Sequence, residues 1–454
     1  MNTINVQSFI DERPLKPFHA ILFVLMFLTI LLDGLDASAM GLIAPALLKQ
    51  MQATRADLAP VLSASLIGIG VGAALGAPFA DRVGRRLVLI VSVALFGGTT
   101  IWSAQSSTLH ELMWSRFFTG IGLGAAIPLC ATMMNEFLPS RMRSRAVNGM
   151  LFGYAVGGGI CGPLARSVIP QHGWQGYLMV CGVAPLIVAV LLLFFLPESV
   201  RYLATAQKDS ARIAGVLARI DPAVDFSGVQ FIADANGAAK KHRFSFVELF
   251  SKELAVPTLL LWVAYICSTV VLYVLLMWTP TIMNAEGRSL ADTANVMMAF
   301  NWFSGIAILL GGILMDKFGS LRIISIYFAI SAILAVVVGI TGVHGDALLW
   351  MLVLTAMGNN GACSSMSTLA TQMYPTSSRA TGAAWVLAVG RFGGVAGTFL
   401  GATLIGLGWP LTTIVAAVAL PTVIASIAIF CIGFGIPSLR HRNDAVEVEA
   451  ALHG

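Results

Sequence analysis

The stretch Gly76-Ala-Pro-Phe-Ala-Asp-Arg-Val-Gly-Arg-Arg86 ends a long apolar segment. A similar stretch occurs later as Gly311-Gly-Ile-Leu-Met-Asp-Lys-Phe-Gly-Ser-Leu-Arg322, and the two begin 235 positions apart. A second pair of stretches, Glu136-Phe-Leu-Pro-Ser-Arg-Met-Arg143 and Gln372-Met-Tyr-Pro-Thr-Ser-Ser-Arg379, is separated by 236 positions. Two different motifs at nearly the same separation indicate that the chain consists of two similar halves.

Composition identifies the broad class of protein. Of the 454 residues, 57% are hydrophobic and only 11% are charged, whereas soluble domains carry about 25% charged residues. Twelve apolar segments reach about 20 residues, the length that a bilayer core requires. Their approximate limits are 20–48, 58–80, 87–106, 111–137, 146–168, 174–196, 255–283, 292–315, 323–343, 348–373, 381–407 and 410–435.

These segments predict an all-α membrane protein whose twelve transmembrane helices form two six-helix bundles. We expect the first bundle over residues 1–196, a cytoplasmic middle loop over 197–254, and the second bundle with a tail over 255–454. In the middle loop, apolar residues from Ile213 to Ile220 have helical spacing, which predicts an amphipathic helix. Six plus six helices in parallel repeats is an architecture of membrane transporters.

Basic residues orient the chain, because cytoplasmic loops of membrane proteins carry an excess of lysine and arginine. With the N-terminus inside, the external loops hold only Lys49, Arg55, Arg166 and Arg288, and the spans hold only Arg116 and Arg391. All the other basic residues then lie on the inner side. Both termini are therefore expected in the cytoplasm, and the net charge of +5 reflects this bias rather than nucleic-acid binding.

Other classes of function are excluded by the residue patterns. The six cysteines all lie in apolar segments, and the seven histidines lie in tails, loops or helix ends. No H-x-x-x-H or C-x-x-C spacing occurs, which argues against a metal site or a metal-dependent enzyme. No Walker motif occurs, which argues against ATP-driven transport. We therefore expect neither an enzyme nor a bound cofactor.

The first span contains two carboxylates, Asp33 and Asp36. One charge at the centre of a membrane helix costs about 2.5–3.5 kcal/mol on insertion scales. A spacing of three places both on one helical face, which we expect to line a wet cavity. There a carboxylate can carry a proton, because desolvation raises its pKa and a nearby arginine lowers it. The alternative is a buried ion pair that only joins helices.

Two arginines lie inside spans. Arg116 is early in the fourth span and can pair with Asp36 or Asp33, contribute to substrate binding, or be purely structural. Arg391 lies ten residues into the eleventh span, and the matching position of the first half is near Ala155. Because a guanidinium binds a carboxylate with two parallel hydrogen bonds, we expect Arg391 to hold an anionic substrate. The alternative is a pair with an aspartate of the first span.

Aromatic and amide side chains in the other spans are candidates to complete a binding pocket. Aromatic faces suit a benzene ring, and asparagines suit phenolic hydroxyls. A membrane tryptophan, however, is more often an interface anchor or a packing residue. The candidates are Tyr273, Trp278, Asn301, Trp302, Asn359, Asn360 and Trp385.

Charged residues at the inner helix ends predict a cytoplasmic gate, in which salt bridges hold the helices closed and break for release. Three groups lie at these ends: Asp81 with its neighbouring arginines, Glu136 with Arg143, and Glu198 with Arg201. We expect salt bridges among them, and proton transfer is a second possibility for Glu136. Ser320 and Gln372 replace charged residues of the first half, so the gate should be asymmetric. The gate residues are Asp81, Arg82, Arg85, Arg86, Arg143, Glu198, Arg201, Asp316 and Arg379.

On these motifs the chain resembles the major facilitator superfamily, since its residues 76–86 match the inner-loop pattern G-x-x-x-x-D-R-x-G-R-R. Further stretches resemble the aromatic acid:proton symporters, and the resemblance covers essentially the whole chain. They are Asp33-Gly-Leu-Asp36, Arg116-Phe-Phe-Thr-Gly-Ile-Gly-Leu-Gly-Ala-Ala-Ile-Pro128, Pro197-Glu-Ser-Val-Arg201, Tyr374-Pro-Thr-Ser-Ser-Arg-Ala-Thr-Gly382 and Gly390-Arg-Phe-Gly-Gly394.

The resemblance implies a monomeric transporter of the bacterial inner membrane. It would import a hydroxybenzoate-like aromatic carboxylate together with protons, by alternating access. An antiporter that exports drugs or metabolites is the alternative within transporters. A sensor that binds aromatic acids but no longer transports them is the alternative from another class. The acidic pair of the first span and Arg391 favour uptake of an anion with protons.

Overall fold

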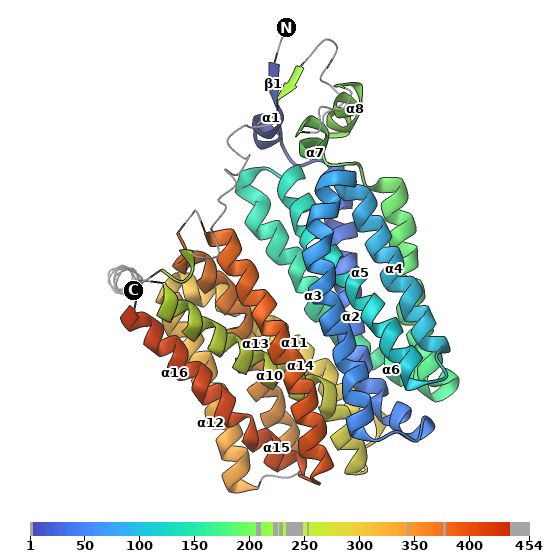
Figure 1. The fold of residues 1–454 in the computed structure, drawn as a ribbon, viewed down its shortest axis with the longest axis vertical. Coiled ribbons are helices and arrows are strands. Elements are labelled where there is room, and N and C mark those ends of the chain that lie inside the picture. The colour runs from blue at the N-terminus through green and yellow to red at the C-terminus, as the bar shows by residue number, and fades with distance from the viewer. Residues whose placement is uncertain are drawn as a thin grey trace. The chain divides into compact units, whose positions relative to one another are not determined.

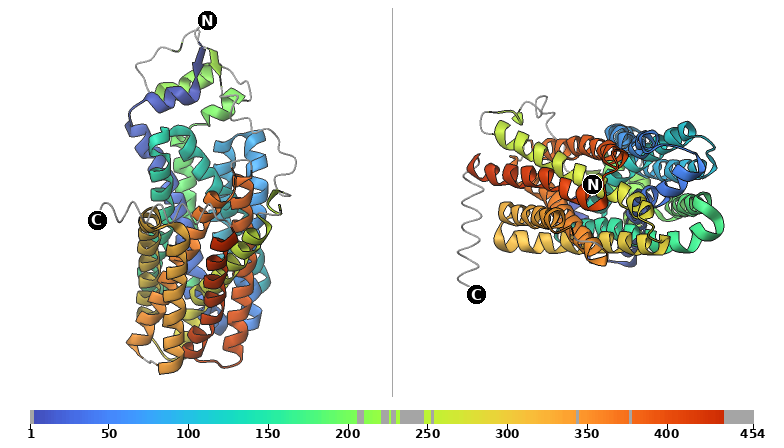
Figure 2. Two further views of the ribbon diagram at one scale, coloured as in Figure 1. Left: turned by 90° about the vertical axis from the view of Figure 1, so that its left-hand side faces the viewer. Right: turned by 90° about the horizontal axis from the view of Figure 1, so that it is seen from below.

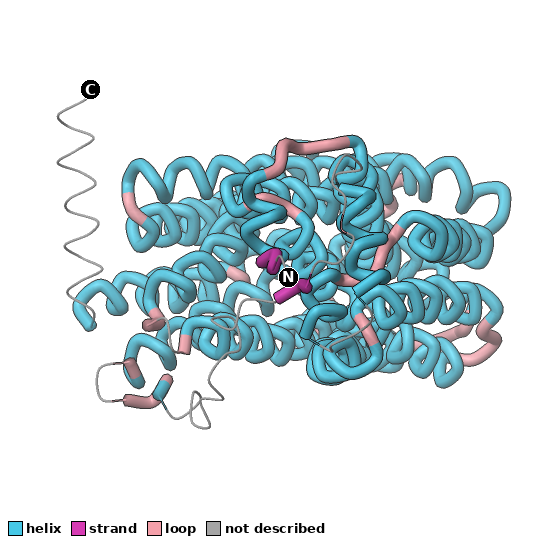
Figure 3. Tube along the Cα trace, turned by 90° about the horizontal axis from the view of Figure 1, so that it is seen from above, coloured by secondary structure: helices cyan, strands magenta, loops and turns pink. Residues whose placement is uncertain are grey.

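The computed structural model describes residues 3–205, 210–220, 226, 230–232, 248–251, 254–342, 345–375 and 378–435, and nearly all of them are helical (Figures 1 and 3). The helices of the first half are α1 (Val6–Glu12), α2 (Pro17–Gln50), α3 (Arg55–Val83), α4 (Arg85–Gln105), α5 (Leu109–Phe137) and α6 (Ser140–Phe195). Next come α7 (Val200–Thr205) and α8 (Ser210–Ile220). The remaining helices are α10 (Ala255–Ala285), α11 (Leu290–Phe318), α12 (Ser320–Thr341), α13 (Asp346–Met373), α14 (Arg379–Gly406), α15 (Leu411–Ala417) and α16 (Ala419–Gly435).

The predicted all-α membrane fold with twelve spans is confirmed in the described part of the chain. Ten helical stretches there are long and apolar enough to cross a membrane, with α15 and α16 counted together. One of the ten, α6, holds two predicted spans, because Gly173 has a φ of 66° that interrupts the helix. Beyond the ten, α13 has 28 residues and is long enough to span as well.

Close contacts divide the chain into two compact units. The first comprises Met1–Asp36, Ile67–Gly157 and Gln171–Lys241, and the second comprises Ala37–Leu66, Gly158–Pro170 and His242–Gly454. The division therefore passes through α2, α3 and α6, whereas the boundaries expected from the sequence lie between helices; those boundaries stay a prediction. Below, the helix ends that carry residues 81–86, 136–143, 316–322 and 372–375 are called the motif ends, and the opposite ends are called the far ends.

In the first unit, α2 and α6 pack closely at glycines. A Cβ atom added at Gly34 would overlap the backbone carbonyl of Tyr154, and one added at Gly157 would overlap the carbonyl of Leu31. Small residues let membrane helices approach to this distance. The two carboxylates of α2 flank this contact, so their positions depend on it.

The second unit has a continuous apolar core between α10, α12, α13, α14 and α16. Leu261, Phe328, Met366, Val386 and Ile429 are among its fully buried side chains. The helices that carry these residues therefore form one packed body, which positions the polar residues of α10, α13 and α14 described below.

An unexpected layer lies at the motif end of the first unit. β1 (Thr3–Asn5) pairs in parallel with β2 (Gln230–Ile232), and the two strands lie side by side beyond α1 and α8 (Figure 2, left). Phe9 of α1 contacts Phe226 edge-on, with ring centroids 5.5 Å apart. The amphipathic helix predicted in the middle loop is present as α8, and it buries Ile213, Leu217 and Ile220. The N-terminal segment is thus held against the middle loop.

Asp11 of α1 caps a helix that begins 129 residues later. The residue before α6, Pro139, supplies no side-chain cap. Instead the Asp11 carboxylate accepts hydrogen bonds from the Ser140 amide (2.9 Å) and hydroxyl (2.8 Å) and from Arg143 Nη2 (3.1 Å). Burial acts to raise the pKa of Asp11, but the Ser140 hydrogen bonds and the Arg143 charge outweigh it and lower that pKa below its ordinary 3.8.

Replacing Asp11 with Asn is expected to loosen this layer by about 1 kcal/mol, the usual value of a helix cap. Because the folded-state pKa is depressed, the stabilisation is complete above the unfolded pKa and is lost as the pH falls through the folded pKa. Hydrogen exchange of the α1 amides should therefore quicken at neutral pH in Asp11→Asn. Glu12→Gln is the matched control, since Glu12 is exposed, and equal exchange in both variants would refute the capping role.

Candidate functional site

Asp36 and Arg116 form a buried ion pair in the first unit. Arg116 Nη1 of α5 donates to Asp36 Oδ1 of α2 at 2.8 Å, and Nη2 donates to Oδ2, which makes the contact bidentate. The side chains are 2% and 1% exposed, respectively. Of the two pairings that the sequence left open for Arg116, the structure contains the one with Asp36. The charges of Asp36 and Arg116 therefore balance each other within the membrane-spanning helices.

Asp33 lies on the same helix, nearly one turn before Asp36, and is also buried. It is within electrostatic range of the Cys130 thiol on α5. Gly34 follows it and contacts the Tyr154 backbone of α6. The bidentate arginine contact in this part of α2 is therefore made by Asp36.

At the motif end of the first unit, Glu136 of α5 pairs with Arg85 of α4. The Ser199 hydroxyl also donates to the Glu136 carboxylate, and Arg85 Nη1 donates to Ser199 Oγ at 3.3 Å. Arg143, from the same sequence motif as Glu136, binds Asp11. The sequence predicted salt bridges among the gate residues without fixing their partners, and the Arg85–Glu136 pair joins two of those residues.

Glu198, from the stretch that follows α6, caps α4. Its Oε1 accepts hydrogen bonds from the backbone amides of Arg85 (2.9 Å) and Arg86 (3.1 Å), where the helix dipole favours a negative charge. Gly84 has a φ of 113°, and a Cβ there would collide with Glu198. Arg201, which lies three positions after Glu198 in the sequence, is exposed. The network joins α4, α5 and the middle loop.

The other predicted gate residues are more peripheral. Asp81 lies 3.6 Å from Arg85 Nη2, but its side chain is 71% exposed, which makes this a weak ion pair. Arg86 donates to the Leu193 carbonyl near the end of α6. Besides Asp81 and Arg201, the exposed members of the predicted gate are Arg82, Asp316 and Arg379.

The second unit holds a neutral counterpart of the Arg85–Glu136 pair. Ser320 and Gln372 occupy the positions that correspond to Arg85 and Glu136 in the repeat. The Ser320 hydroxyl donates to Gln372 Oε1 at 2.6 Å. Each half therefore joins the same two helix positions, one by an ion pair and the other by a hydrogen bond, which agrees with the asymmetry expected from the sequence.

This correspondence predicts how the ion pair responds to substitution. Glu136→Gln alone leaves the half-buried Arg85 without its carboxylate, so we expect a loss of about 3 kcal/mol in stability. The double variant Arg85→Ser/Glu136→Gln reproduces the neutral pair and should recover most of that loss. Thermal unfolding midpoints of the purified variants in one detergent measure both effects. A double variant less stable than Glu136→Gln would show that the halves do not use equivalent contacts.

In the second unit, Arg391 of α14 lies within electrostatic range of Tyr265 of α10. Tyr265 and Cys363 belong to the same buried core, and Tyr265 and Ser268 both lie within electrostatic range of the Cys363 thiol. Asn359 Nδ2 then donates to the Ser268 carbonyl at 3.0 Å. We call these residues the Arg391 network.

Sequence reasoning named only Arg391 and Asn359 from this network. Tyr265, Ser268 and Cys363 were missed, because single polar residues in apolar helices do not reveal which neighbour they meet. One signal was available in Gly390. A Cβ there would overlap the Tyr265 ring, so the glycine permits the phenol to lie beside Arg391.

The other two asparagines predicted for a pocket lie in separate polar contacts of the second unit. Asn301 of α11 donates to the Met297 carbonyl and accepts from the Ser38 hydroxyl at 3.5 Å. Asn360 of α13 donates to Ser304 Oγ at 2.7 Å. The Oδ1 atom of Asn360 is buried and has no hydrogen-bond partner among the described residues. Asn360 therefore retains an acceptor that a ligand hydroxyl could use.

The predicted aromatic residues have different environments. Trp278 is fully buried and donates from Nε1 to the Thr398 carbonyl at 2.8 Å, so packing explains it. Trp385 stacks on Trp262 with ring centroids 5.9 Å apart. Trp302 lies against Gly159, and Tyr273 lies against Gly394. Tyr273 is one helical turn from the Ser268–Thr269 segment of α10, on the helix that contributes to the Arg391 network.

Comparison with known proteins places the chain among transporters. The family model described as Major Facilitator Superfamily matches residues 26–294 and 282–450. The chain is 39% identical over 430 residues to the 4-hydroxybenzoate transporter PcaK of Pseudomonas aeruginosa, with 95% of this chain and 96% of that protein covered. It is 34% identical over 430 residues to a gallate transporter of Pseudomonas putida, with 95% of each chain covered.

Solved structures share the fold. A bacterial homologue of the human lysosomal transporter Spinster, in an inward-facing and occupied conformation, has a TM-score of 0.74 at 15% identity and covers 94% of this chain and 99% of its own. The xylose transporter XylE of E. coli, inward open, has a TM-score of 0.72 at 19% identity and covers 90% of this chain and 95% of its own.

Proposed function

Because this chain belongs to the Major Facilitator Superfamily, whose members are transporters and not enzymes, we propose that it imports an aromatic carboxylate together with protons by alternating access. The named relatives carry 4-hydroxybenzoate and gallate, both of which are hydroxylated aromatic acids. We place the protein in a bacterial inner membrane with both termini in the cytoplasm, as the distribution of basic residues suggests. It then acts as a monomer.

The Arg391 network is the observation that carries the substrate assignment. It combines a guanidinium, which suits a carboxylate, with a phenol and a buried amide, which suit a hydroxylated ring. Arg116 is less suited to this role, because it holds Asp36 in a buried bidentate pair. Asn360, with its buried acceptor, is a further candidate for a ring hydroxyl.

Asp33 is the proposed proton carrier. A carboxylate that titrates during transport must alternate between environments that favour its charged and neutral forms. Asp36 is poorly suited to that task, since losing its charge would leave Arg116 buried beside a neutral partner. Glu136 is likewise bound to Arg85 at the motif end. We assign that ion pair, with Glu198, to the cytoplasmic gate.

Substitution of Arg391 tests the substrate assignment. Arg391→Lys keeps the charge but loses the two-pronged contact, so binding of 4-hydroxybenzoate should weaken by about 1.5–3 kcal/mol. Arg391→Ala should lose more, because the anion would enter a poorly compensated site. Calorimetry of the purified variants measures both losses. The neutral amide 4-hydroxybenzamide is the control and should bind wild type and Arg391→Ala equally.

The result that contradicts the assignment is also defined. If Arg391→Ala binds 4-hydroxybenzoate as tightly as the wild type while its unfolding midpoint falls, the arginine is structural. If the wild type binds but does not exchange labelled 4-hydroxybenzoate across a proteoliposome membrane, the protein is a sensor rather than a transporter.

A further inference from the structure

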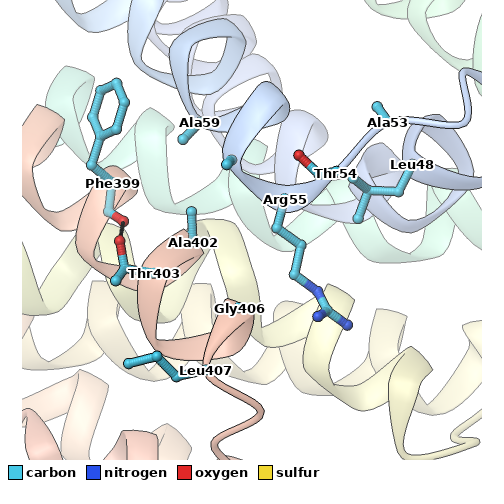
Figure 4. A pocket seen from close by; sticks show the side chains of 11 residues that line it. Leu48, Ala53, Thr54, Arg55, Ala59, Phe399, Ala402, Thr403, Gly406 and Leu407 are labelled. Atoms are coloured by element: carbon cyan, nitrogen blue, oxygen red, sulfur yellow. Dashed lines mark hydrogen bonds between the residues drawn. The ribbon is translucent and has the colours of Figure 1, made fainter.

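A pocket of about 780 Å³ lies at the far ends of α2, α3 and α14, entirely within the second unit (Figure 4). Its walls come from Leu48 of α2, the turn after it, Arg55 and Ala59 of α3, and Phe399 and Thr403 of α14. This volume falls within the range of small-molecule sites, about 300–1,000 Å³. None of these residues belongs to the Arg391 network. Thr403 follows Arg391 by twelve positions, about 18 Å along α14.

Arg55 is the only charged residue among those that line this pocket. Its Nη1 donates to the Ile405 carbonyl, in the last turn of α14, at 3.3 Å. That bond uses one of five N–H donors of the guanidinium. Arg55 is also one of the four basic residues that the sequence predicts in the external loops. A cation here faces the side from which an anionic substrate arrives.

The hydroxyls at the pocket are already engaged as donors. Thr54 Oγ1 donates to Asp57 at 2.6 Å, and Thr403 Oγ1 donates to the Phe399 carbonyl at 3.0 Å. The Asp57 carboxylate also accepts from the Thr54 amide at 2.9 Å, just before α3 begins. The positive charge of Arg55 is therefore the main polar attraction, and the nearby Asp57 carboxylate limits its strength.

The remaining wall is apolar. Phe399 presents a partly exposed ring, and Leu48, Ala402 and Leu407 are aliphatic. In the view of Figure 4, Ala402 lies between Phe399 and Arg55. The combination of one cation with an apolar wall suits an anion with a hydrophobic body.

We propose that this pocket is a second binding site, separate from the Arg391 network, for an amphipathic monoanion. The oxyanion contacts Arg55, and the apolar part lies against Phe399 and Leu407. Two sources have this chemistry: a free aromatic carboxylate captured before transport, and an anionic phospholipid of the outer leaflet. The competing explanation is that Arg55 only caps α14 through the Ile405 carbonyl, which would affect stability but not ligand binding.

The test uses the full-length protein in nanodiscs of neutral phosphatidylcholine, with 3-fluoro-4-hydroxybenzoate observed by fluorine NMR. We expect the ligand to bind tightly at the Arg391 network and more weakly at a second class of sites, which is this pocket. Arg55→Ala should weaken the second class about five-fold, as expected for a partly exposed ion pair. Ala402→Trp, which fills the pocket, should abolish it. Arg166→Ala is the matched control, because Arg166 is exposed and lies outside the pocket.

A second set of nanodiscs contains phosphatidylglycerol and distinguishes the two sources. If the lipid is the occupant, wild type should enrich phosphatidylglycerol over Arg55→Ala in the lipid that copurifies, and the weak aromatic class should be absent. The site is supported if Arg55→Ala weakens the second class of aromatic-acid binding or lowers the amount of phosphatidylglycerol that copurifies. The proposal is overturned if neither ligand distinguishes wild type from Arg55→Ala. If the wild type shows no tight class but keeps the weak class that depends on Arg55, the result would count against the Arg391 assignment and support this pocket.

Discussion

Replacing Arg116 with leucine is expected to destabilise the protein by about 3–5 kcal/mol, one of the largest effects of any single substitution in this chain. The reason is the buried carboxylate that remains. Asp36 is 2% exposed and has its charge balanced by Arg116 through a bidentate contact. Asp36→Leu should be comparably harmful, because it leaves the guanidinium unpaired. Thermal unfolding midpoints in detergent measure these losses.

The double variant Asp36→Leu/Arg116→Leu separates folding from coupling. Replacing both charges with apolar groups is often neutral for stability, so this variant should fold nearly as well as the wild type. If it also transports normally, the pair is a structural joint between α2 and α5. If it folds but does not transport, the pair takes part in the cycle. Single variants as stable as the wild type would show that the pair is not buried in the membrane.

Gly34→Ala is expected to have the second large effect, a loss of about 2–3 kcal/mol together with loss of transport. The added methyl group would overlap the Tyr154 carbonyl, which is backbone and cannot rotate away. The helices α2 and α6 would have to separate, and Asp33 and Asp36 would move with α2. Unfolding midpoints and initial uptake rates provide the two readouts.

Gly149→Ala is the matched control for Gly34→Ala. It lies in the same helix pair, but its Cβ would meet only the Phe23 ring, at an ordinary 3.5 Å. Both substitutions raise helix propensity to a similar degree, so that contribution cancels. If the two variants have equal midpoints and equal uptake, the close approach at Gly34 does not hold α2 in place.

The length and spacing of apolar segments made most of the fold predictable. The twelve spans follow from segments of about 20 residues, and the two halves follow from paired motifs. The break in α6 at Gly173 falls between the predicted spans 146–168 and 174–196, although helical structure continues on both sides of it. The pairing of β1 with β2 was not predictable, since three-residue strands more than 200 positions apart carry no periodic signal.

The sequence identified individual residues of the candidate site better than it identified the contacts between them. Charges inside membrane helices stand out because they are costly, and this identified Asp36, Arg116 and Arg391. Their partners depend on helix packing. Salt bridges were expected among the gate residues without fixed partners, and the packing of α4 on α5 brings Arg85 to Glu136. Tyr265 was overlooked for a related reason. The space for its ring is provided by Gly390, which lies on another helix, α14.

Uptake driven by an imposed pH gradient tests the central claim most directly. Proteoliposomes of the wild type should accumulate labelled 4-hydroxybenzoate against its gradient when the outside is acidic, and a trapped pH dye should report acidification of the lumen. Asp33→Asn should still exchange labelled for unlabelled substrate at equal concentrations but should not accumulate it. Accumulation without proton movement, or full accumulation by Asp33→Asn, would contradict proton coupling through this carboxylate.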